Sequence, residues 1–325
     1  MIYFANLVLT NIFSIFELNK LGMQKGLTIS GFRKQFKTEE DCLNYLITLK
    51  WGNGFKCIKC GCEQYSKGRQ WFYRRCKHCA YDESVTANTM FHKCKLGLLR
   101  AFEMGFRLSV KKKGMSSCEL AKEFGCHQMS AWLLKAKYQN AMKSSDKYPL
   151  EAAVEVDEFL VGGFNEGERG RSLESKQLVV LAVEKVVDKK GKMTIGRAYA
   201  KVIENASAEQ FKPFFEQKID IDSKIKTDGW RGYWPLQKEW TIEKQLTEKG
   251  KGFPELHVHI MNIKGWLRGV HHKCKGNRLQ NYMDEFHFRF NRRGFLDTIL
   301  YKLIGRAMDM KPVTYQSIRL CELNH

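Results

Sequence analysis

Two pairs of cysteines constrain the fold of this chain more than any other feature of its sequence. Both pairs have the spacing C-x-x-C, and 15 residues separate them. Each pair can present two thiolates from one tight turn, and a hairpin between the pairs would bring all four together. Four thiolates form a closed, structural zinc site, so we predict structural zinc bound by Cys57, Cys60, Cys76 and Cys79.

The use of cysteine also indicates the compartment. The chain has 11 cysteines, an odd number, and four of them have metal-type spacing rather than the pattern of a disulfide framework. This usage is typical of a reducing environment, so we expect a cytoplasmic protein. Cys62 and His78 lie close to the two pairs, and we regard them as second-choice zinc ligands.

The charge of the chain indicates the class of its partner. Lys and Arg total 55 and Asp and Glu total 35, which gives a net charge of +20. The basic excess lies in residues 1–150 and 257–325, whereas residues 151–256 are nearly neutral. Such a balance suits a polyanionic partner, and nucleic acid is the usual one. Because 43% of the residues are hydrophobic, the chain can bury a core, which excludes wholesale disorder.

The apolar N-terminus does not predict a membrane span. Residues 2–16 form too short a run to cross a bilayer, and polar residues interrupt them. They also lack the basic segment that begins a secretion signal. We expect a buried helix here, or a start assigned upstream of Met23, and no membrane partner.

The segment between the cysteine pairs interleaves basic and aromatic residues, among them Trp71 and Tyr73. This composition suits phosphate contact and base stacking, and an ordinary solvated hairpin is the alternative. The basic residues that we expect to contact DNA here are Lys67, Arg69, Arg74 and Arg75.

Residues 96–145 have a helical pattern and contain a candidate helix-turn-helix. A capping box at 116–119 begins one helix, Gly125 permits a turn, and a second helix would run from Gln128 to about Met142. A packing hairpin without DNA contact is the alternative. The residues that we expect to contact DNA are Lys111, Lys112, Gln128, Ser130 and Lys135.

The middle of the chain is predicted to alternate strands and helices. Strands are expected at 153–161, 178–187, 194–203 and 224–228, with a helix near 207–218. Asp157 lies within the first strand, where a carboxylate is costly unless it is paired or holds a metal. Asp228 ends the last strand, before a glycine turn. Carboxylates at neighbouring strand ends can share divalent cations, so both aspartates are candidate metal ligands.

The neighbours of these aspartates have weaker predictions. Strand alternation puts Glu155 on the same face as Asp157 and Glu158 on the opposite face, so we interpret Glu158 as structural. The aromatic residues that follow Asp228 are predicted to be core rather than base-stacking residues, namely Trp230, Tyr233 and Trp234.

The order of these features resembles insertion-sequence transposases of the ISXO type, in which a zinc ribbon and a helix-turn-helix precede a ribonuclease H-like DDE catalytic domain. The matching segments are 57–79, 154–163, 227–233, 264–272 and 279–293. The resemblance implies a mixed α/β chain with these divisions: an N-terminal extension (1–30), a helix plus zinc ribbon (31–95), a helix-turn-helix region (96–148), a catalytic domain (149–310) and a C-terminal tail (311–325).

The resemblance also implies a third metal ligand beside Asp157 and Asp228. This ligand is usually Glu, with Lys seven residues later, but the residue seven before Lys264 is His257. Some zinc-ribbon members resemble this chain in having His or Asn there, and Asn262 is the main rival of His257, with His259 a further one. The expected catalytic cation is magnesium or manganese, and Lys264 would hold a phosphate. Further basic residues expected to contact DNA are Arg268, Arg289 and Arg292.

The function that the resemblance implies is DNA transposition. The protein would bind the terminal inverted repeats of an insertion sequence, cut a phosphodiester with metal-activated water, and transfer the strand to target DNA. Pairing two ends implies a homo-oligomer on double-stranded DNA, associated with the nucleoid. Two alternatives stay open, namely an inactive DNA-binding regulator, which His in place of Glu favours, and a metal-dependent nuclease without strand transfer.

Overall fold

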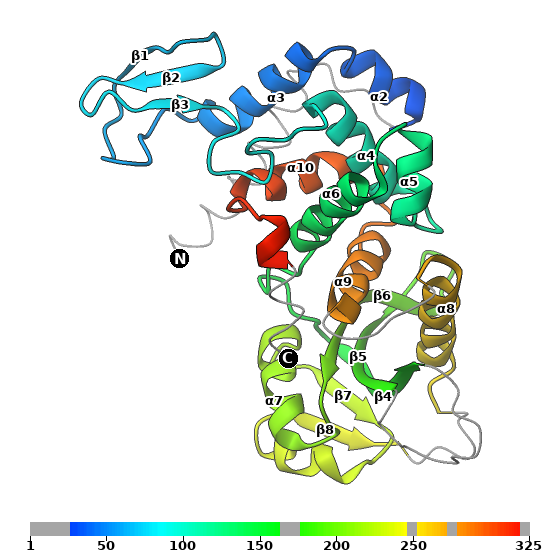
Figure 1. Ribbon diagram of the computed structural model, residues 1–325. Coiled ribbons are helices and arrows are strands. Elements are labelled where there is room, and N and C mark those ends of the chain that lie inside the picture. The colour runs from blue at the N-terminus through cyan, green and yellow to red at the C-terminus, as the bar shows by residue number, and fades with distance from the viewer. Residues whose placement is uncertain (1–26, 163–175, 246–251, 272–277, 319–325) are drawn as a thin grey trace.

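The computed structural model describes residues 27–162, 176–245, 252–271 and 278–318. The apolar segment 2–16, for which a buried helix is expected, lies outside the described residues. The described chain forms a helical body from which a small β-hairpin sheet projects, and an α/β unit beside it (Figure 1). Within this part of the chain, no helix combines the length and the apolar character needed to cross a membrane.

The helical body begins with α2 (Ile29–Gln35) and α3 (Glu39–Trp51). A reciprocal capping box starts α3, because the Thr38 hydroxyl accepts the N–H of Asp41 at 3.2 Å while the Asp41 carboxylate accepts the N–H of Thr38 at 2.8 Å. The projecting sheet consists of three short antiparallel strands in sequence order. Its strands are β1 (Tyr65–Lys67), β2 (Tyr73–Cys76) and β3 (Asp82–Ser84).

Three helices follow, as the pattern of residues 96–145 predicts. The Ser116 hydroxyl accepts the N–H of Glu119 at 3.1 Å and begins the second of them, and Gly125 adopts the positive φ of 56° that the turn needs. The three helices are α4 (Leu98–Val110), α5 (Ser117–Glu123) and α6 (Gln128–Ala141).

A five-stranded sheet forms the centre of the α/β unit, in the order β6-β5-β4-β7-β8. Its first three strands are antiparallel, whereas β7 runs parallel to β4 and β8 runs parallel to β7. This is the ribonuclease H-like fold within the predicted mixed α/β class. The strands are β4 (Ala153–Gly162), β5 (Lys176–Val187), β6 (Met193–Ile203), β7 (Lys224–Thr227) and β8 (Thr241–Lys244).

Helices cover both faces of this sheet (Figure 1). Val154 and Val156 of β4 pack in one core, with α7 (Ala208–Lys218) and the 3-10 helix η1 (Arg231–Lys238). Phe159 and Val161 pack in the other core, with α8 (Pro254–Val270) and α9 (Leu279–Phe290). Because alternate residues of a strand face opposite sides, Asp157 lies on the α8 side and Glu158 on the α7 side.

The last helix corrects the predicted division of the chain. We expect residues 149–310 to form one catalytic domain, but α10 (Ile299–Asp309) packs in the core of the helical body. Tyr301 lies 6.0 Å from the ring of Tyr45 in α3, and its hydroxyl bonds the side chain of Gln35. The chain therefore returns to its N-terminal body after completing the α/β unit, a contact that no local pattern indicates.

Two residues predicted to contact DNA are instead buried between α6 and α9. Lys135 is 4% exposed and Arg289 is 8% exposed, and both face the fully buried carboxylate of Glu285, at 3.6 Å and 3.5 Å. Burial by itself raises the pKa of Glu285, but Lys135 and Arg289 lower it overall. The prediction for these two residues is wrong, because both side chains form a buried ion cluster with Glu285. This cluster joins the helical body to the α/β unit.

Removal of Glu285 should therefore destabilise the protein severely. Glu285→Ala would leave Lys135 and Arg289 buried without a counter-charge, and we expect a loss of about 3–5 kcal/mol in the free energy of unfolding, measured by chemical denaturation. The matched control is Glu243→Ala, whose side chain is 70% exposed and lies 3.8 Å from Lys226, and which should cost less than about 1 kcal/mol. A similarly small loss of unfolding free energy in both variants would contradict the assignment of Glu285 to a buried ion cluster.

Candidate active site and zinc site

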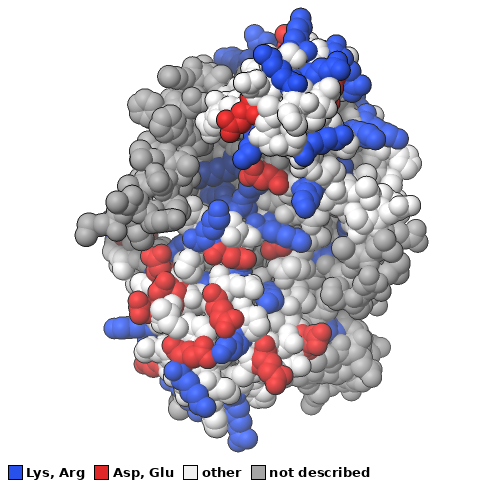
Figure 2. All heavy atoms as spheres, turned by 90° about the vertical axis from the view of Figure 1, so that its left-hand side faces the viewer, with Lys and Arg blue, Asp and Glu red and all other residues white. Residues whose placement is uncertain are grey.

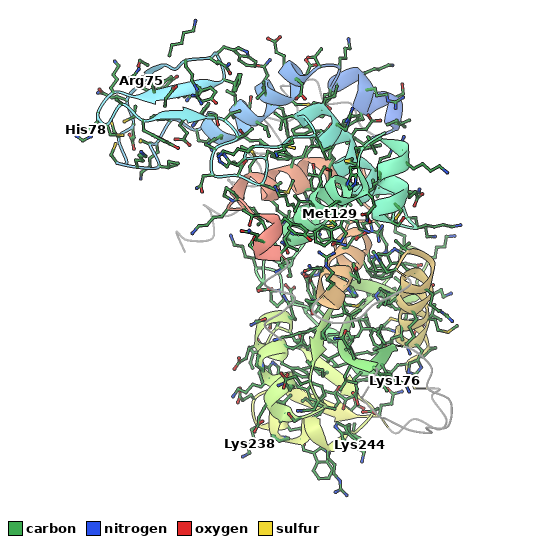
Figure 3. All side chains as sticks on the ribbon, in the orientation of Figure 1. Arg75, His78, Met129, Lys176, Lys238 and Lys244 are labelled. Atoms are coloured by element: carbon green, nitrogen blue, oxygen red, sulfur yellow. The ribbon has the colours of Figure 1, made fainter. Side chains whose placement is uncertain are left out.

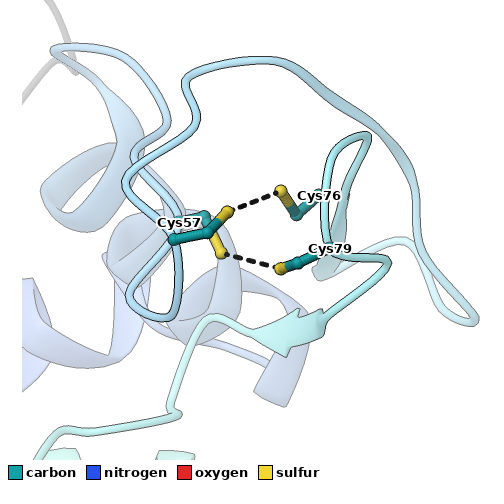
Figure 4. A group of neighbouring side chains, drawn as sticks. Cys57, Cys76 and Cys79 are labelled. Atoms are coloured by element: carbon teal, nitrogen blue, oxygen red, sulfur yellow. Dashed lines mark hydrogen bonds between the residues drawn. The ribbon is translucent and has the colours of Figure 1, made fainter.

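The four predicted zinc ligands converge in the projecting sheet. The Sγ atoms of Cys57, Cys60, Cys76 and Cys79 all lie within 4.8 Å of one another. Sulfur atoms of the two pairs approach to 3.6 Å between Cys57 and Cys79 and to 3.5 Å between Cys60 and Cys76 (Figure 4). Tetrahedral zinc with bonds of about 2.3 Å needs sulfur atoms at nearly this separation. The thiol set therefore fits structural zinc.

The backbone of the second knuckle favours thiolate at Cys76. The backbone N–H of Cys79 is the strongest of several donors that lower the pKa of Cys76 to about 6. The second-choice ligands lie elsewhere, since the Cys62 thiol points to the carbonyl of Gln64 at 3.8 Å. His78 lies at the outer end of the sheet and points away from it (Figure 3).

The basic residues of the zinc ribbon form an exposed surface. Arg69 lies over the ring of Tyr73, and Arg74 lies over the rings of Trp51 and Tyr65. Arg75 extends outward near His78 (Figure 3), and Lys67 is exposed. Basic side chains gather over this end of the molecule, whereas acidic ones gather over the opposite half of the face drawn in Figure 2. The expected DNA contacts of the ribbon are thus sterically accessible.

In the second helix of the helix-turn-helix, α6, the exposed residues lie in the first turn. Gln128 and Met129 are exposed at the first turn of α6 (Figure 3), and Ser130 is half-buried. Farther along α6, one side chain after another is buried against α4, α9 and α10. Lys111 is half-buried and pairs with Glu119, while Lys112 is exposed.

Asp157 is a largely buried carboxylate in the middle of β4. Its side chain is 16% exposed, and Oδ1 accepts the N–H of Glu158 at 2.8 Å. Burial raises the pKa of Asp157, and the nearby carboxylate of Asp228 raises it further, against the opposing effects of Glu158 and His257. A positive charge placed beside this carboxylate would stabilise its ionised form.

Asp228 reaches the same place from the neighbouring strand. The parallel register pairs Glu155 with Lys226, so its continuation by two residues sets Asp228 beside Asp157. Adjacent strands lie about 4.8 Å apart, which brings the two residues well within a helix diameter. Asp228 Oδ1 accepts the N–H of Trp230 at 3.0 Å, which fixes its orientation after the strand end.

Helix α8 supplies the third side chain. His257 Nε2 lies 3.2 Å from Asp157 Oδ2, so this histidine faces the aspartates. Asn262 is exposed on another side of α8. His259 is buried with its Nε2 3.3 Å from that of His287, and burial lowers its pKa to about 2. Of the three rivals, only His257 is in contact with Asp157.

An open pocket of about 560 Å³ lies beside Asp157 and His257. Its lining includes Asp157, His257 and Lys264. It also includes Trp230, the residue just before the 3-10 helix η1. Lys264 lies two turns beyond His257 on α8, with its Nζ 5.6 Å from the ring of Phe159, and burial lowers its pKa. The pocket therefore combines acidic, basic and aromatic groups.

The donor set of the pocket fits a divalent cation. Carboxylate oxygens suit magnesium, and an imidazole nitrogen beside them also suits manganese. Burial and the Asp228 carboxylate raise the pKa of Asp157, so a bound cation would stabilise its ionised form. Across the described ranges, only the four cysteines have ligand atoms all within 4.8 Å of one another, so Asp157, Asp228 and His257 are spread more widely.

The remaining predicted residues have mixed outcomes. Glu155 pairs with Lys185 at 3.2 Å, and Glu158 accepts the hydroxyl of Tyr233 at 2.9 Å, as a structural residue would. Arg268 is exposed on α8, whereas Arg292 is half-buried over the ring of Phe288.

The aromatic prediction is right for one residue of three. Tyr233 is 1% exposed and belongs to the core. Trp230 and Trp234 are 39% and 50% exposed, so their assignment to the core is wrong. Short apolar runs beside a glycine turn do not distinguish a buried indole from one that lines an open pocket.

Two segments of the chain match family models of transposase domains. Residues 149–291 match the family model of the ISXO2-like transposase domain, and residues 37–82 match that of the transposase zinc-ribbon domain. No curated protein matches this chain. The two matched segments contain the α/β unit and the four-cysteine sheet, so the chain carries an ISXO2-like transposase domain preceded by a transposase zinc-ribbon domain.

Proposed function

We propose that the protein cuts the ends of an insertion sequence and joins them to target DNA, with Asp157, Asp228, His257 and Lys264 at its active site. The observation that carries this proposal is the contact of 3.2 Å between His257 Nε2 and Asp157 Oδ2, in a pocket that Lys264 also lines. Asp157 of β4 thereby meets His257 of α8, and Asp228, which follows β7, lies near enough to raise the pKa of Asp157. A metal-dependent phosphoryl transferase needs such a group of side chains.

Each side chain has a role that follows from its position. Asp157 and Asp228 would hold divalent cations, and His257 would orient Asp157 or complete the ligand set. Bound cations of this kind activate the attacking oxygen and stabilise the leaving one. Lys264 would bind a phosphate oxygen and keep the strand in line. Direct transfer between oxygens on this scheme needs no covalent bond between protein and DNA.

The remainder of the chain would select and hold the DNA. The exposed ribbon residues Lys67, Arg69 and Arg75 would contact the backbone, and Gln128 at the first turn of α6 would reach base edges. We further propose that two ends are paired by a homo-oligomer, and that the protein acts in the cytoplasm at the nucleoid.

Substitution of His257 tests the composition of the site. His257→Ala should slow 3′-end cleavage by about 10- to 100-fold, because a group that holds or orients a metal ligand typically contributes this much. The substrate is a linear duplex that carries the DNA flanking the gene. Asn262→Ala is the matched control on the same helix and should cut at the wild-type rate. The opposite ranking of these two variants would make Asn262 the third residue.

A further inference from the structure

Arg292, just beyond α9, differs from its neighbours in the same basic tract. Arg289 faces the carboxylate of Glu285 at 3.5 Å. The side-chain amide of Asn291 accepts the N–H of Ala198 and donates to its carbonyl oxygen, at 2.9 Å each. Arg292 Nη1 donates to a carbonyl oxygen of α9 at 3.2 Å, and its guanidinium forms no ion pair within the described ranges. Its charge is therefore left over when the tract has packed.

Two cations of α10 lie beside Arg292. The guanidinium carbons of Arg292 and Arg306 lie over the same ring, that of Phe288, at 4.1 Å and 5.6 Å from its centre. Burial and the charge of Arg306 lower the pKa of Arg292 to about 10. Burial also lowers the pKa of Lys302, one turn before Arg306, and both arginines lower it further. We call Arg292, Lys302 and Arg306 the three-cation cluster.

Acidic residues of the described chain do not neutralise this cluster. Burial lowers the pKa of Arg306, and Asp284 counters that effect only in part. Asp297 acts on Lys302 in the same way, but neither aspartate forms an ion pair with the cluster. On the α6 side of the same helix, by contrast, the buried cations share Glu285. Like charges held together away from water are costly unless an anion joins them.

The three-cation cluster is open to an anion from solvent. Lys302 is exposed, and Arg292 and Arg306 are half-buried. Arg306 Nη1 donates to the carbonyl oxygens of Ala141 at 3.4 Å and Lys143 at 2.8 Å, which holds the side chain in place. Within the described ranges, Nε and Nη2 of both arginines form no hydrogen bond and are not fully buried. These nitrogens can therefore donate to an oxyanion, and guanidinium groups bind phosphate through paired N–H donors.

The cluster is separate from the active-site pocket. None of its three residues lines that pocket. Asn291, beside Arg292, bonds Ala198 of β6, and β6 lies two strands away from β4, which carries Asp157. Helix α10 belongs to the helical body, whereas α9 packs on the sheet of the α/β unit (Figure 1). A ligand of the cluster would therefore lie where the two units meet.

We propose that Arg292, Lys302 and Arg306 bind a phosphate group at this junction. Three positive charges and several free N–H donors suit a tetrahedral oxyanion, and a bound phosphate would offset the repulsion among the cations. It would also link the segment after α9 to α10 and so strengthen the contact between the two units. A backbone phosphate of bound DNA and a free phosphate ion share this chemistry. The first source takes DNA as the partner, as the proposed function does, whereas the second is independent of it.

Thermal unfolding in inorganic phosphate tests the site without catalysis. Compared with chloride at equal ionic strength, and without added magnesium or manganese, phosphate should raise the Tm of the wild type by about 2–4 °C. Lys302→Ala and Arg292→Gln should lose most of this rise, and Lys302→Ala keeps the test valid if the other variant alters the fold, because Lys302 is exposed. The matched controls Lys238→Ala and Arg100→Gln make the same changes at other exposed positions and should keep the rise. Lys264→Ala should also keep it, since Lys264 belongs to the pocket.

The salt dependence of DNA binding identifies the source of the phosphate. The probe is a linear duplex of the DNA that flanks the gene. If a backbone phosphate occupies the cluster, the slope of log K against log salt concentration should be shallower by about 1 in Lys302→Ala than in Lys238→Ala. Equal slopes with a lost phosphate response would assign the site to a free phosphate ion. The proposal is overturned if Lys302→Ala changes neither the phosphate response nor the slope. Failure of the proposed function looks different, since the wild type would then cut no DNA end while these two measurements still decide the phosphate site.

Discussion

Asp157→Asn should abolish 3′-end cleavage while the protein still binds the DNA that flanks its gene. The substitution keeps the size of the side chain but removes the charge that would hold a cation between β4 and β7. Metal-ion catalysis contributes several kcal/mol to the transition state, so we expect a loss of about a thousandfold or more. DNA binding should persist, because the exposed basic residues of the zinc ribbon lie in another part of the molecule.

The same variant should also change the thermal stability in a characteristic way. Burial and Asp228 raise the pKa of Asp157, so above the ordinary Asp range the ionised group opposes folding, and stability falls as the pH rises through the raised pKa. Asn removes this cost, and the Tm without added cation should not be lower than that of the wild type. Manganese at 100 times its Kd should stabilise the wild type by about 2.7 kcal/mol and Asp157→Asn much less.

Asp222→Asn is the matched control for both measurements. Asp222 is exposed in the turn before β7, and the substitution makes the same chemical change outside the pocket. It should cleave at the wild-type rate and keep the manganese response. If Asp157→Asn cuts DNA at the wild-type rate, the active-site assignment is wrong.

The features that the sequence predicted best depend on short, regular spacings. Two C-x-x-C pairs need only one hairpin to meet, and short apolar runs predict β4, β5 and β6 to within two residues at each end. The choice of His257 came from the resemblance, which implies a third residue seven positions before Lys264, and His257 Nε2 lies 3.2 Å from Asp157 Oδ2. Asp157 and Asp228 became neighbours once their strands were paired in parallel.

The features that the sequence missed depend on partners far away in the chain. Lys135 pairs with Glu285, which is 150 residues farther along the chain. Arg289 donates to the carbonyl oxygen of Lys111, 178 residues upstream. Helix α10 packs against α3 and α4, which both end before residue 111. Charge and periodicity describe one element at a time, so they cannot show which elements share a core.

Cys76→Ser should release zinc and unfold the projecting sheet without unfolding the α/β unit. The strands β1, β2 and β3 are three or four residues long, and all of β1 is exposed, so this sheet has little apolar core of its own. Structural zinc supplies about 10–16 kcal/mol in small zinc-binding modules, far more than such strands can provide. The hydroxyl of Ser is a poor substitute for a thiolate as a zinc ligand. The two knuckles would therefore lose the zinc ion that holds them together.

Zinc content and hydrogen exchange measure this effect together. We expect less than about half of the zinc to remain in Cys76→Ser, and the amides of 73–76 to lose their protection while those of β4 and β5 keep theirs. Cys62→Ser is the matched control, because the Cys62 thiol faces the Gln64 carbonyl and lies outside the four-cysteine group. DNA affinity should fall in the first variant alone, since its unfolded ribbon no longer presents Arg69 and Arg75 on a fixed surface. Full zinc occupancy in Cys76→Ser would show that Cys76 is not a ligand.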